Sequence, residues 1–328
     1  MLLAYQIHRP RLEVGARLRR LAAAREFALL IMIAIIVVIM TAISPHFMSM
    51  ANFRAMGAGL VPTGILVVGM TYLLVSGGFD LSVGSVLALT STICAYLMAA
   101  GWGIPAAVLA TLIVGTLIGL VNGGLVTGFG INPLVATLGT MSAARGIALV
   151  MTEGFSVSNL PPGFGAVGNV NVLGMPGIVW IMLALVLLGD VGLRYSGFFR
   201  QIYFVGSNEQ SARLSGIDVT KVRLVAYGLT GLLAAVAGIL LASRLMSGTP
   251  TAGAGLELQV LAAAVIGGAS LKGGEGSVLG AFLGAVFVAL INNAMTMLAV
   301  SIYWQMIVTG GVLVAAVAID MLGRRGRS

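Results

Sequence analysis

Several carboxamide side chains stand inside long apolar stretches of this sequence, where polar groups are rare. Each carboxamide both donates and accepts hydrogen bonds, so a group of them suits an uncharged ligand that is rich in hydroxyl groups. A single asparagine of this kind is more often a hydrogen-bonding partner between helices, and that interpretation stays open beside the first. The candidates for a pathway that carries such a ligand are Asn122, Asn132, Gln259, Asn292 and Asn293.

A short polar segment, GGFDLSVGS, interrupts an apolar stretch at residues 77–85. Its glycines should end one helix, and its aspartate and serine stand where the next helix should begin, a position at which an aspartate is stabilised by the helix dipole and can act as a cap. The segment is therefore a structural cap, or a gate built on discontinuous helices, and the two roles are compatible. The gate candidates are Gly77, Gly78, Asp80 and Ser82. The stretch from Gly267 to Ser277 is a loose echo of this pattern.

The longest polar run in the interior of the chain is Ser207–Val222. Its pattern predicts a short helix that Ser207 or Asn208 caps at the start and that Gly216 ends in the left-handed conformation. A solvated connector needs neither these caps nor the apolar spacing that the run contains. We therefore interpret it as a docking element for a cytoplasmic partner.

The sequence lacks the common patterns of enzyme chemistry. It has two isolated histidines, His8 and His46, a single cysteine, Cys94, and no phosphate-binding G-x-x-x-x-G-K-[ST] motif. A G-x-G-x-x-G match at residues 163–168 follows two prolines rather than a strand, and an apolar span follows it, so it does not indicate a dinucleotide site. We expect no enzyme activity, no metal ion and no cofactor bound by this chain.

The composition is that of a membrane protein that crosses the bilayer many times. Of the 328 residues, 59% are hydrophobic and only 9% are charged, against roughly 25% charged in soluble domains. We predict an all-α fold with about ten transmembrane helices in a single domain over residues 27–321. Two cytoplasmic tails flank it, an arginine-rich one at 1–26 and a short one at 322–328. The expected spans are 27–43, 58–76, 82–100, 104–127, 133–151, 177–193, 224–245, 256–271, 278–298 and 303–321. The run 256–271 is short, so it could be broken or re-entrant.

The basic residues predict which loops face the cytoplasm. In a ten-span arrangement, 14 of the 18 lysines and arginines fall on one side, in the N-terminal tail, in the loop 194–223 and at the C-terminus. Both termini are then cytoplasmic, and residues 153–175 form an outward-facing ordered loop. The net charge of +8 therefore reports topology, and nucleic acid is not an expected partner.

Two further features concern how the helices pack. Glycines recur every four residues at Gly115, Gly119 and Gly123, and again at Gly276, Gly280 and Gly284, which favours close approach of helices. Arg145 lies within a predicted span, and because a charge in the bilayer costs roughly 2.5–3.5 kcal/mol on insertion scales, it should face the interior of the bundle.

Four segments resemble the ribose/xylose/arabinose-type permeases of bacterial ABC importers. They are GGFDLSVGS, INPLVATLGTMSAARGIAL, GSNEQSARLSGI and LAAAVIGGASLKGGEGSVLGA, and the likeness extends from about Phe27 to Asp320. The resemblance implies a type II ABC importer fold in the bacterial inner membrane and import of a monosaccharide or related polyol. It also implies three protein partners: a cytoplasmic ATPase that binds ATP and Mg²⁺, a periplasmic sugar-binding protein, and a second permease copy, which is identical or a close paralogue.

The same resemblance implies a role for the central polar run as the helix that couples the permease to the ATPase. The coupling candidates are Gly206, Ser207, Asn208, Glu209, Ala212, Arg213, Leu214, Gly216 and Ile217. Two alternatives stay open: a secondary transporter, which would need ionisable residues in its spans, and a channel that works without an ATPase. The sequence does not distinguish one sugar or polyol from another.

Overall fold

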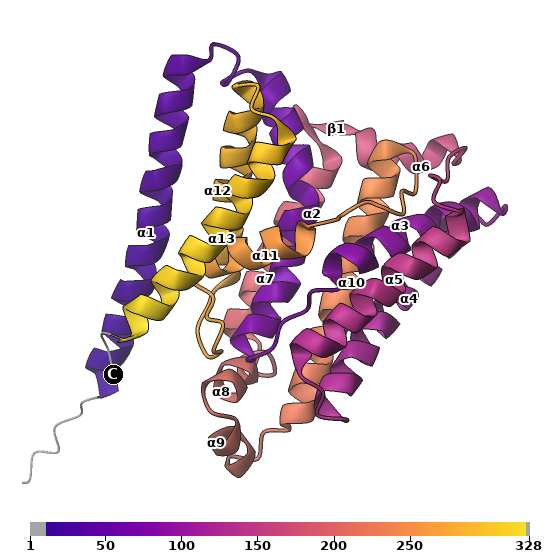
Figure 1. Cartoon of the computed structure of the whole chain (residues 1–328). Coiled ribbons are helices and arrows are strands. Elements are labelled where there is room, and N and C mark those ends of the chain that lie inside the picture. Colours follow the sequence, from indigo (N-terminus) through magenta and orange to yellow (C-terminus); the bar gives the residue numbers. More distant parts are fainter. Residues whose placement is uncertain (1–10, 326–328) are drawn as a thin grey trace, which may run out of the picture.

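The computed structural model describes residues 11–325 and is almost entirely helical (Figure 1). The elements are α1 (Arg11–Ile43), α2 (Met50–Val75), α3 (Val83–Ala99), α4 (Ile104–Thr127), α5 (Pro133–Thr152), α6 (Pro162–Asn169), β1 (Asn171–Val172), β2 (Met175–Pro176), α7 (Gly177–Tyr195), α8 (Gln201–Ser207), α9 (Glu209–Leu214), α10 (Val219–Leu245), α11 (Leu256–Ile266), α12 (Val278–Met297) and α13 (Ile302–Arg325).

Each of the ten apolar runs that the sequence marks as a span contains a helix. Seven helices in the described part of the chain have the length and hydropathy to cross a bilayer, namely α1, α2, α4, α5, α7, α10 and α12. The helices α3 and α11 are apolar but shorter. The full count of ten crossings therefore stays a prediction, whereas the multi-pass helical architecture is confirmed.

The helix α10 packs along α4, α3 and α2 (Figure 1). The predicted glycine stripe of α4 lies in this contact. A Cβ at Gly119 would overlap the carbonyl oxygen of Tyr227, and one at Gly231 of α10 would overlap the carbonyl of Gly115. The two backbones touch because these residues have no side chains, which confirms that the stripe serves packing.

We expect Gly119→Ala to destabilise the bundle and Gly124→Ala to leave it intact. Both residues are in α4, but a Cβ at Gly124 meets open space, and alanine there also favours the helix by about 1 kcal/mol over glycine. At Gly119 the added methyl must push α10 away, and overpacking of this kind costs typically 1–3 kcal/mol. Thermal unfolding of the purified variants in detergent measures the difference. Equal midpoints for the two variants would contradict the packing argument.

The second predicted stripe holds in part. Gly280 and Gly284 of α12 pack against the backbone of α11 at Gly267 and Ala263. Gly276, however, precedes α12 and has a φ of +151°, so it belongs to the loop and not to the helix stripe. The four-residue spacing of glycines in the sequence extends to a position before the start of α12, which lies at Val278. Ser277 caps this helix by accepting a hydrogen bond from Gly280 N.

The two ends of the bundle differ in the segments that they carry. Figure 1 shows the first described turn of α1, the end of α13, and α8 with α9 at the same end of the molecule. The segment 153–175 lies at the opposite end, where it forms α6 and the antiparallel pair β1–β2. The G-x-G-x-x-G match lies inside α6, although no helix was expected there. The all-α prediction thus needs one small correction, a hairpin of two two-residue strands.

Two of the helices, α3 and α11, begin partway along the length of the bundle and not at one of its ends. After α2 ends, residues 76–82 run inward as a non-helical segment before α3 begins (Figure 1). After α10, residues 246–255 run in from the other end before α11, whose 11 residues span only about 16 Å of a bilayer core that is roughly 30 Å thick. Gly84 in the first turn of α3 lies against Gly253, just before α11. The predicted span 256–271 is therefore broken rather than continuous.

The structure shows no break between residues 26 and 27, where the sequence predicts that the N-terminal tail ends and the first span begins. The helix α1 runs without interruption from Arg11 to Ile43, so residues 11–26 of the arginine-rich tail are helical. Residues 1–10 and 326–328, which include Arg9 and Arg327 of the predicted tails, lie outside the described residues.

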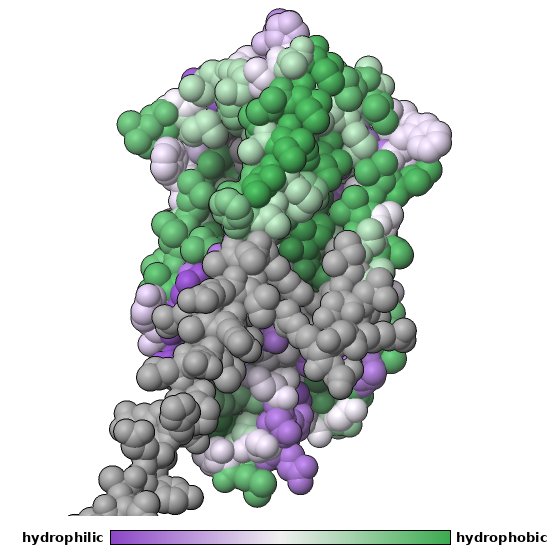
Figure 2. Space-filling view, turned by 90° about the vertical axis from the view of Figure 1, so that its left-hand side faces the viewer, coloured by the Kyte–Doolittle hydropathy of each residue, from purple (hydrophilic) through white to green (hydrophobic). Residues whose placement is uncertain are grey.

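The surface agrees with a bilayer environment. Figure 2 shows apolar side chains over most of the described part of one face and hydrophilic side chains gathered at its lower end. This lower end is the one at which α8 and α9 lie in Figure 1. On α4 the exposed side chains include Leu109, Ile113, Leu117 and Val121, which repeat at helical spacing along one face. Such a face suits contact with lipid or with another helix.

Candidate functional site

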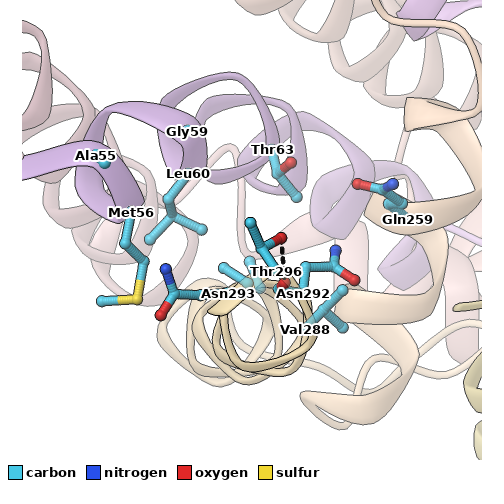
Figure 3. Close-up of a pocket in the computed structure, with 12 residues that line it drawn as sticks. Ala55, Met56, Gly59, Leu60, Thr63, Gln259, Val288, Asn292, Asn293 and Thr296 are labelled. Carbon is cyan, nitrogen blue, oxygen red and sulfur yellow. Dashed lines mark hydrogen bonds between the residues drawn. The ribbon is translucent and has the colours of Figure 1, made fainter. Parts of the chain in front are cut away.

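The candidate site is a pocket among α2, α11 and α12 (Figure 3). Its volume is about 260 Å³, slightly below the usual range of about 300–1,000 Å³ for ligand pockets. It brings together three of the five predicted pathway amides. The lining residues are Ala55, Met56, Gly59, Leu60, Thr63, Gln259, Ala285, Val288, Ala289, Asn292, Asn293 and Thr296.

Two of these carboxamides make no hydrogen bond to another side chain or backbone group in residues 11–325. Gln259 reaches into the pocket from α11, and Asn292 points toward it from α12 (Figure 3). Neither carboxamide makes a hydrogen bond to another residue in the part of the chain that the structure describes, and the same holds for the Thr63 hydroxyl. Their donors and acceptors are thus available to a ligand, each carboxamide offering both kinds.

The third amide has a structural partner. Asn293 and Asn52 exchange two hydrogen bonds, with Nδ2 of Asn293 donating to Oδ1 of Asn52 at 2.8 Å and the reverse bond at 3.2 Å. Asn52 also donates to the carbonyl of Phe47 at 2.9 Å. This reciprocal pair fixes α12 against the start of α2, and of the two residues only Asn293 lines the pocket. The sequence did not indicate Thr63 as a site residue, because a lone threonine in an apolar helix forms no pattern.

Asn122 lies apart from the pocket, in a buried polar cluster at the α2–α3 break. Its Nδ2 donates to Asp80 Oδ2 at 3.1 Å and to Ser82 Oγ at 3.0 Å, and its Oδ1 accepts from the hydroxyl of Thr140 at 2.6 Å. Asp80 and Asn122 are 1% and 0% exposed. The cluster joins α4 and α5 to the break, so in this structure Asn122 serves as a partner of the gate candidates.

Asp80 holds the turn that leads into α3. Its Oδ1 accepts hydrogen bonds from the backbone N–H and the hydroxyl of Ser82, at 2.7 and 2.6 Å. Ser82 is the N-cap residue of α3, and its own side chain makes no capping hydrogen bond. Asp80 therefore fixes the turn that precedes α3, whereas no N–H inside the helix donates to it. Gly77 has a φ of +81°, which a residue with a side chain rarely adopts.

Asn132 is the N-cap residue of α5. Its Oδ1 accepts from the backbone N–H of Leu134 at 2.9 Å, and the residue is exposed. Arg145, in the same helix, donates to the carbonyls of Pro250 and Ala252 at 2.7 and 2.8 Å. Arg145 thus anchors the non-helical segment that leads into α11. Its side chain points toward other parts of the bundle, which confirms the prediction that it faces inward.

The central loop folds as its caps predicted. Asn208 caps α9 by accepting from Ser211 N at 2.9 Å. At the other end Gly216 has a φ of +81°, its N–H donates to Arg213, and Ile217 N donates to Ala212, which together form a Schellman motif. The loop 194–223 also contains α8, which ends at Ser207, and its margins are the last turn of α7 and the first turn of α10.

The side chains of α9 divide into inward and outward groups. Ala212 is 3% exposed and belongs to the hydrophobic core, whereas Leu214 is 84% exposed. Glu209 pairs with two arginines, Arg213 and Arg223, each at 2.8 Å. The hydrogen bond from Arg213 is the main cause that lowers the pKa of Glu209, with the charge of Arg223 adding to it. Glu209 therefore stays ionised at neutral pH.

Comparison with known families decides what kind of protein this is. The family model described as "branched-chain amino acid transport system / permease component" matches residues 56–317. The chain belongs to this permease family. The permease resembles several curated relatives over nearly its whole length, which confirms the likeness inferred from its motifs. Among solved structures, none matches it.

Three relatives of the permease illustrate the likeness. The ribose import permease protein RbsC of Haemophilus influenzae is 38% identical over 307 residues, which cover 92% of this chain and 94% of the relative. RbsC of Escherichia coli is 39% identical over 295 residues, 89% and 92% of the two chains. The L-arabinose transport system permease protein AraH of Escherichia coli is 34% identical over 302 residues, 92% of each.

Proposed function

We propose that this chain is the membrane permease of an ABC importer that carries a monosaccharide or related polyol into the cytoplasm. A partner ATPase supplies the energy by hydrolysing ATP with Mg²⁺, a periplasmic binding protein delivers the sugar, and two permease copies form the pathway. The names of the relatives, ribose and arabinose permeases, support the substrate class. The family supports a multi-pass location in the bacterial inner membrane.

The observation that carries the substrate proposal is the chemistry of the pocket. Gln259 and Asn292 present carboxamides that make no hydrogen bond to another residue within 11–325, and Thr63 adds a hydroxyl. A sugar offers adjacent hydroxyl groups that both donate and accept, which matches these side chains. The apolar residues of the wall, such as Leu60 and Val288, can face the C–H surfaces of a sugar ring.

The family name also raises a branched-chain amino acid as a substrate. Such a ligand carries an ammonium and a carboxylate, and desolvating these charges is costly unless each finds a partner. In the part of the chain that the structure describes, none of the twelve residues that line the pocket is charged. The pocket therefore favours an uncharged polyol over an amino acid.

The arrangement of the ends supports a cytoplasmic position for both termini. The start of α1, the end of α13, and α8–α9 share one end of the bundle (Figure 1). An even number of crossings places them on one side of the membrane, and the basic residues at these three places favour the cytoplasm.

We expect Gln259→Ala and Asn292→Ala to lower sugar uptake at least fivefold each. Loss of a hydrogen bond to a ligand costs about 1 kcal/mol or more, and 1.4 kcal/mol is a factor of ten. Asn171→Ala is the matched control, since it removes an exposed amide in β1 that does not line the pocket. Uptake of radiolabelled sugars by proteoliposomes that hold the permease, its ATPase and its binding protein measures this. If Gln259→Ala and Asn292→Ala both transport like the control and the parent, the pocket is not on the pathway.

A further inference from the structure

Three glycine-rich segments from distant parts of the sequence meet at the α8 end of the bundle. Gly206 of α8 lies so close to α2 that a Cβ there would overlap the carbonyl oxygen of Val75. The same carbonyl accepts a hydrogen bond from Gly274 N at 2.8 Å. A Cβ on Gly273 would lie 3.0 Å from the Cα atoms of both Gly206 and Gly77. The backbones of α8, the α2–α3 break and the 267–277 loop are therefore in direct contact.

A charged side chain adds a second tie at the same place. Arg223, in the first turns of α10, pairs through Nη1 with Glu209 of α9 at 2.8 Å. Its Nε donates to the carbonyl oxygen of Ser76, at the end of α2, at 3.3 Å. The side chain is only 20% exposed, so this bridge is better shielded from solvent than the exposed pair of Glu209 with Arg213.

Further hydrogen bonds extend from this junction along both loops. Tyr203 of α8 donates to the carbonyl of Gly276 at 2.8 Å, and Tyr227 of α10 donates to the carbonyl of Phe79 at 3.1 Å. The segment after Phe79 leads to the start of α3, and the 267–277 loop leaves the end of α11. Because α11 carries Gln259, a displacement of this loop acts on a helix that lines the pocket.

We propose that Gly206 and Arg223 are positioning residues that transmit a displacement of α9 to the α2–α3 break and to the loop after α11 together. This proposal rests on the proposed ABC-importer function and deepens it by naming the route between ATPase and pocket. Backbones in direct contact leave no side chain that can rotate to absorb a shift. Packed elements of this kind move as units, since close-packed interiors do not deform continuously.

Two matched pairs of variants test the route. Gly206→Ala inserts a methyl into the junction, whereas Gly197→Ala changes a glycine earlier in the same loop whose Cβ would meet no atom within 4 Å. Arg223→Gln removes the bridge to Ser76, whereas Lys221→Gln removes a positive charge from an exposed position in the same turn of α10. Each variant is reconstituted with the ATPase and the binding protein, and ATPase retention, ATP hydrolysis and sugar uptake are measured.

We expect Gly206→Ala and Arg223→Gln to retain the ATPase and hydrolyse ATP while sugar uptake per ATP falls at least tenfold. The two controls should keep the parent ratio. A purely structural defect would lower the amount of folded complex but would not change this ratio. Arg223→Gln adds no volume to the core. If Gly206→Ala does not fold, the ratio of uptake to hydrolysis in Arg223→Gln therefore tests the route by itself.

The outcomes separate the route from the function on which it rests. If the parent complex takes up sugar and Arg223→Gln keeps the parent ratio of uptake to hydrolysis, the route through this junction is wrong and the importer function stands. If the parent permease neither holds an ATPase nor takes up sugar, the proposed function fails, and the route fails with it.

Discussion

Leu214→Asp is expected to release the partner ATPase from the permease while the permease itself folds normally. Leu214 is 84% exposed on α9, beyond the end of the membrane helices, where lipid does not account for a large apolar side chain. Burial of a leucine at an interface contributes about 1.5–3 kcal/mol, and an unpaired carboxylate in its place adds a desolvation cost. We expect affinity for the ATPase to fall at least thirtyfold.

Co-purification of the ATPase with tagged permease measures this loss, and the thermal midpoint of the permease alone checks its fold. Leu214→Met is the matched control, because it keeps an apolar side chain of similar volume and should retain the ATPase. If Leu214→Asp holds the ATPase as firmly as the parent does, α9 is a connector and the coupling proposal is wrong.

The other coupling candidates are less suited to this test than the sequence suggested. Ala212 lies in the permease's own core, so Ala212→Glu would not test docking alone. A glutamate there disturbs the packing of α9 itself. At Gly216 the φ of +81° makes any side chain costly, by roughly 1–2 kcal/mol, so Gly216→Val loosens the end of α9 before any partner is involved.

Asp80→Leu is expected to destabilise the permease by at least about 3 kcal/mol and to abolish transport. The change leaves three buried donors without their acceptor: the N–H and hydroxyl of Ser82 and one N–H of the Asn122 amide, whose other N–H still donates to Ser82 Oγ. Each such loss costs about 1–3 kcal/mol, and at 1% exposure no water replaces the carboxylate. The cost exceeds the roughly 1 kcal/mol expected for a helix cap alone.

Asp80→Asn is the matched control and should fold and keep much of the transport activity. One oxygen remains to accept from Ser82, and the Asn122 amide can turn over because the Thr140 hydroxyl on its other side can accept as well as donate. Thermal unfolding in detergent and sugar uptake in proteoliposomes measure both variants. Normal folding of Asp80→Asn with complete loss of uptake would show that the charge has a role beyond the hydrogen bonds.

The sequence alone determined the features that arise from neighbouring residues. The helix spans follow from apolar runs that glycines, prolines and polar breaks interrupt. The cap of α9 follows from Asn208 and Gly216, because capping depends on backbone groups within one turn. The likeness to sugar permeases also came from local motifs, and the ribose and arabinose permeases among the relatives confirmed it.

Only the tertiary structure decided which polar residues act together. Asn122 joins Asp80 across 42 positions, Asn293 joins Asn52 across 241, and Gln259 meets Asn292 in one pocket. These helices are apolar around most of their circumference, so their sequences carry little information on which face turns toward which neighbour. For the same reason the contact of Gly206 with Gly274 could not be foreseen. A glycine in the sequence does not indicate which other backbone segment will pack against it. The partner segment is determined only when the whole bundle packs.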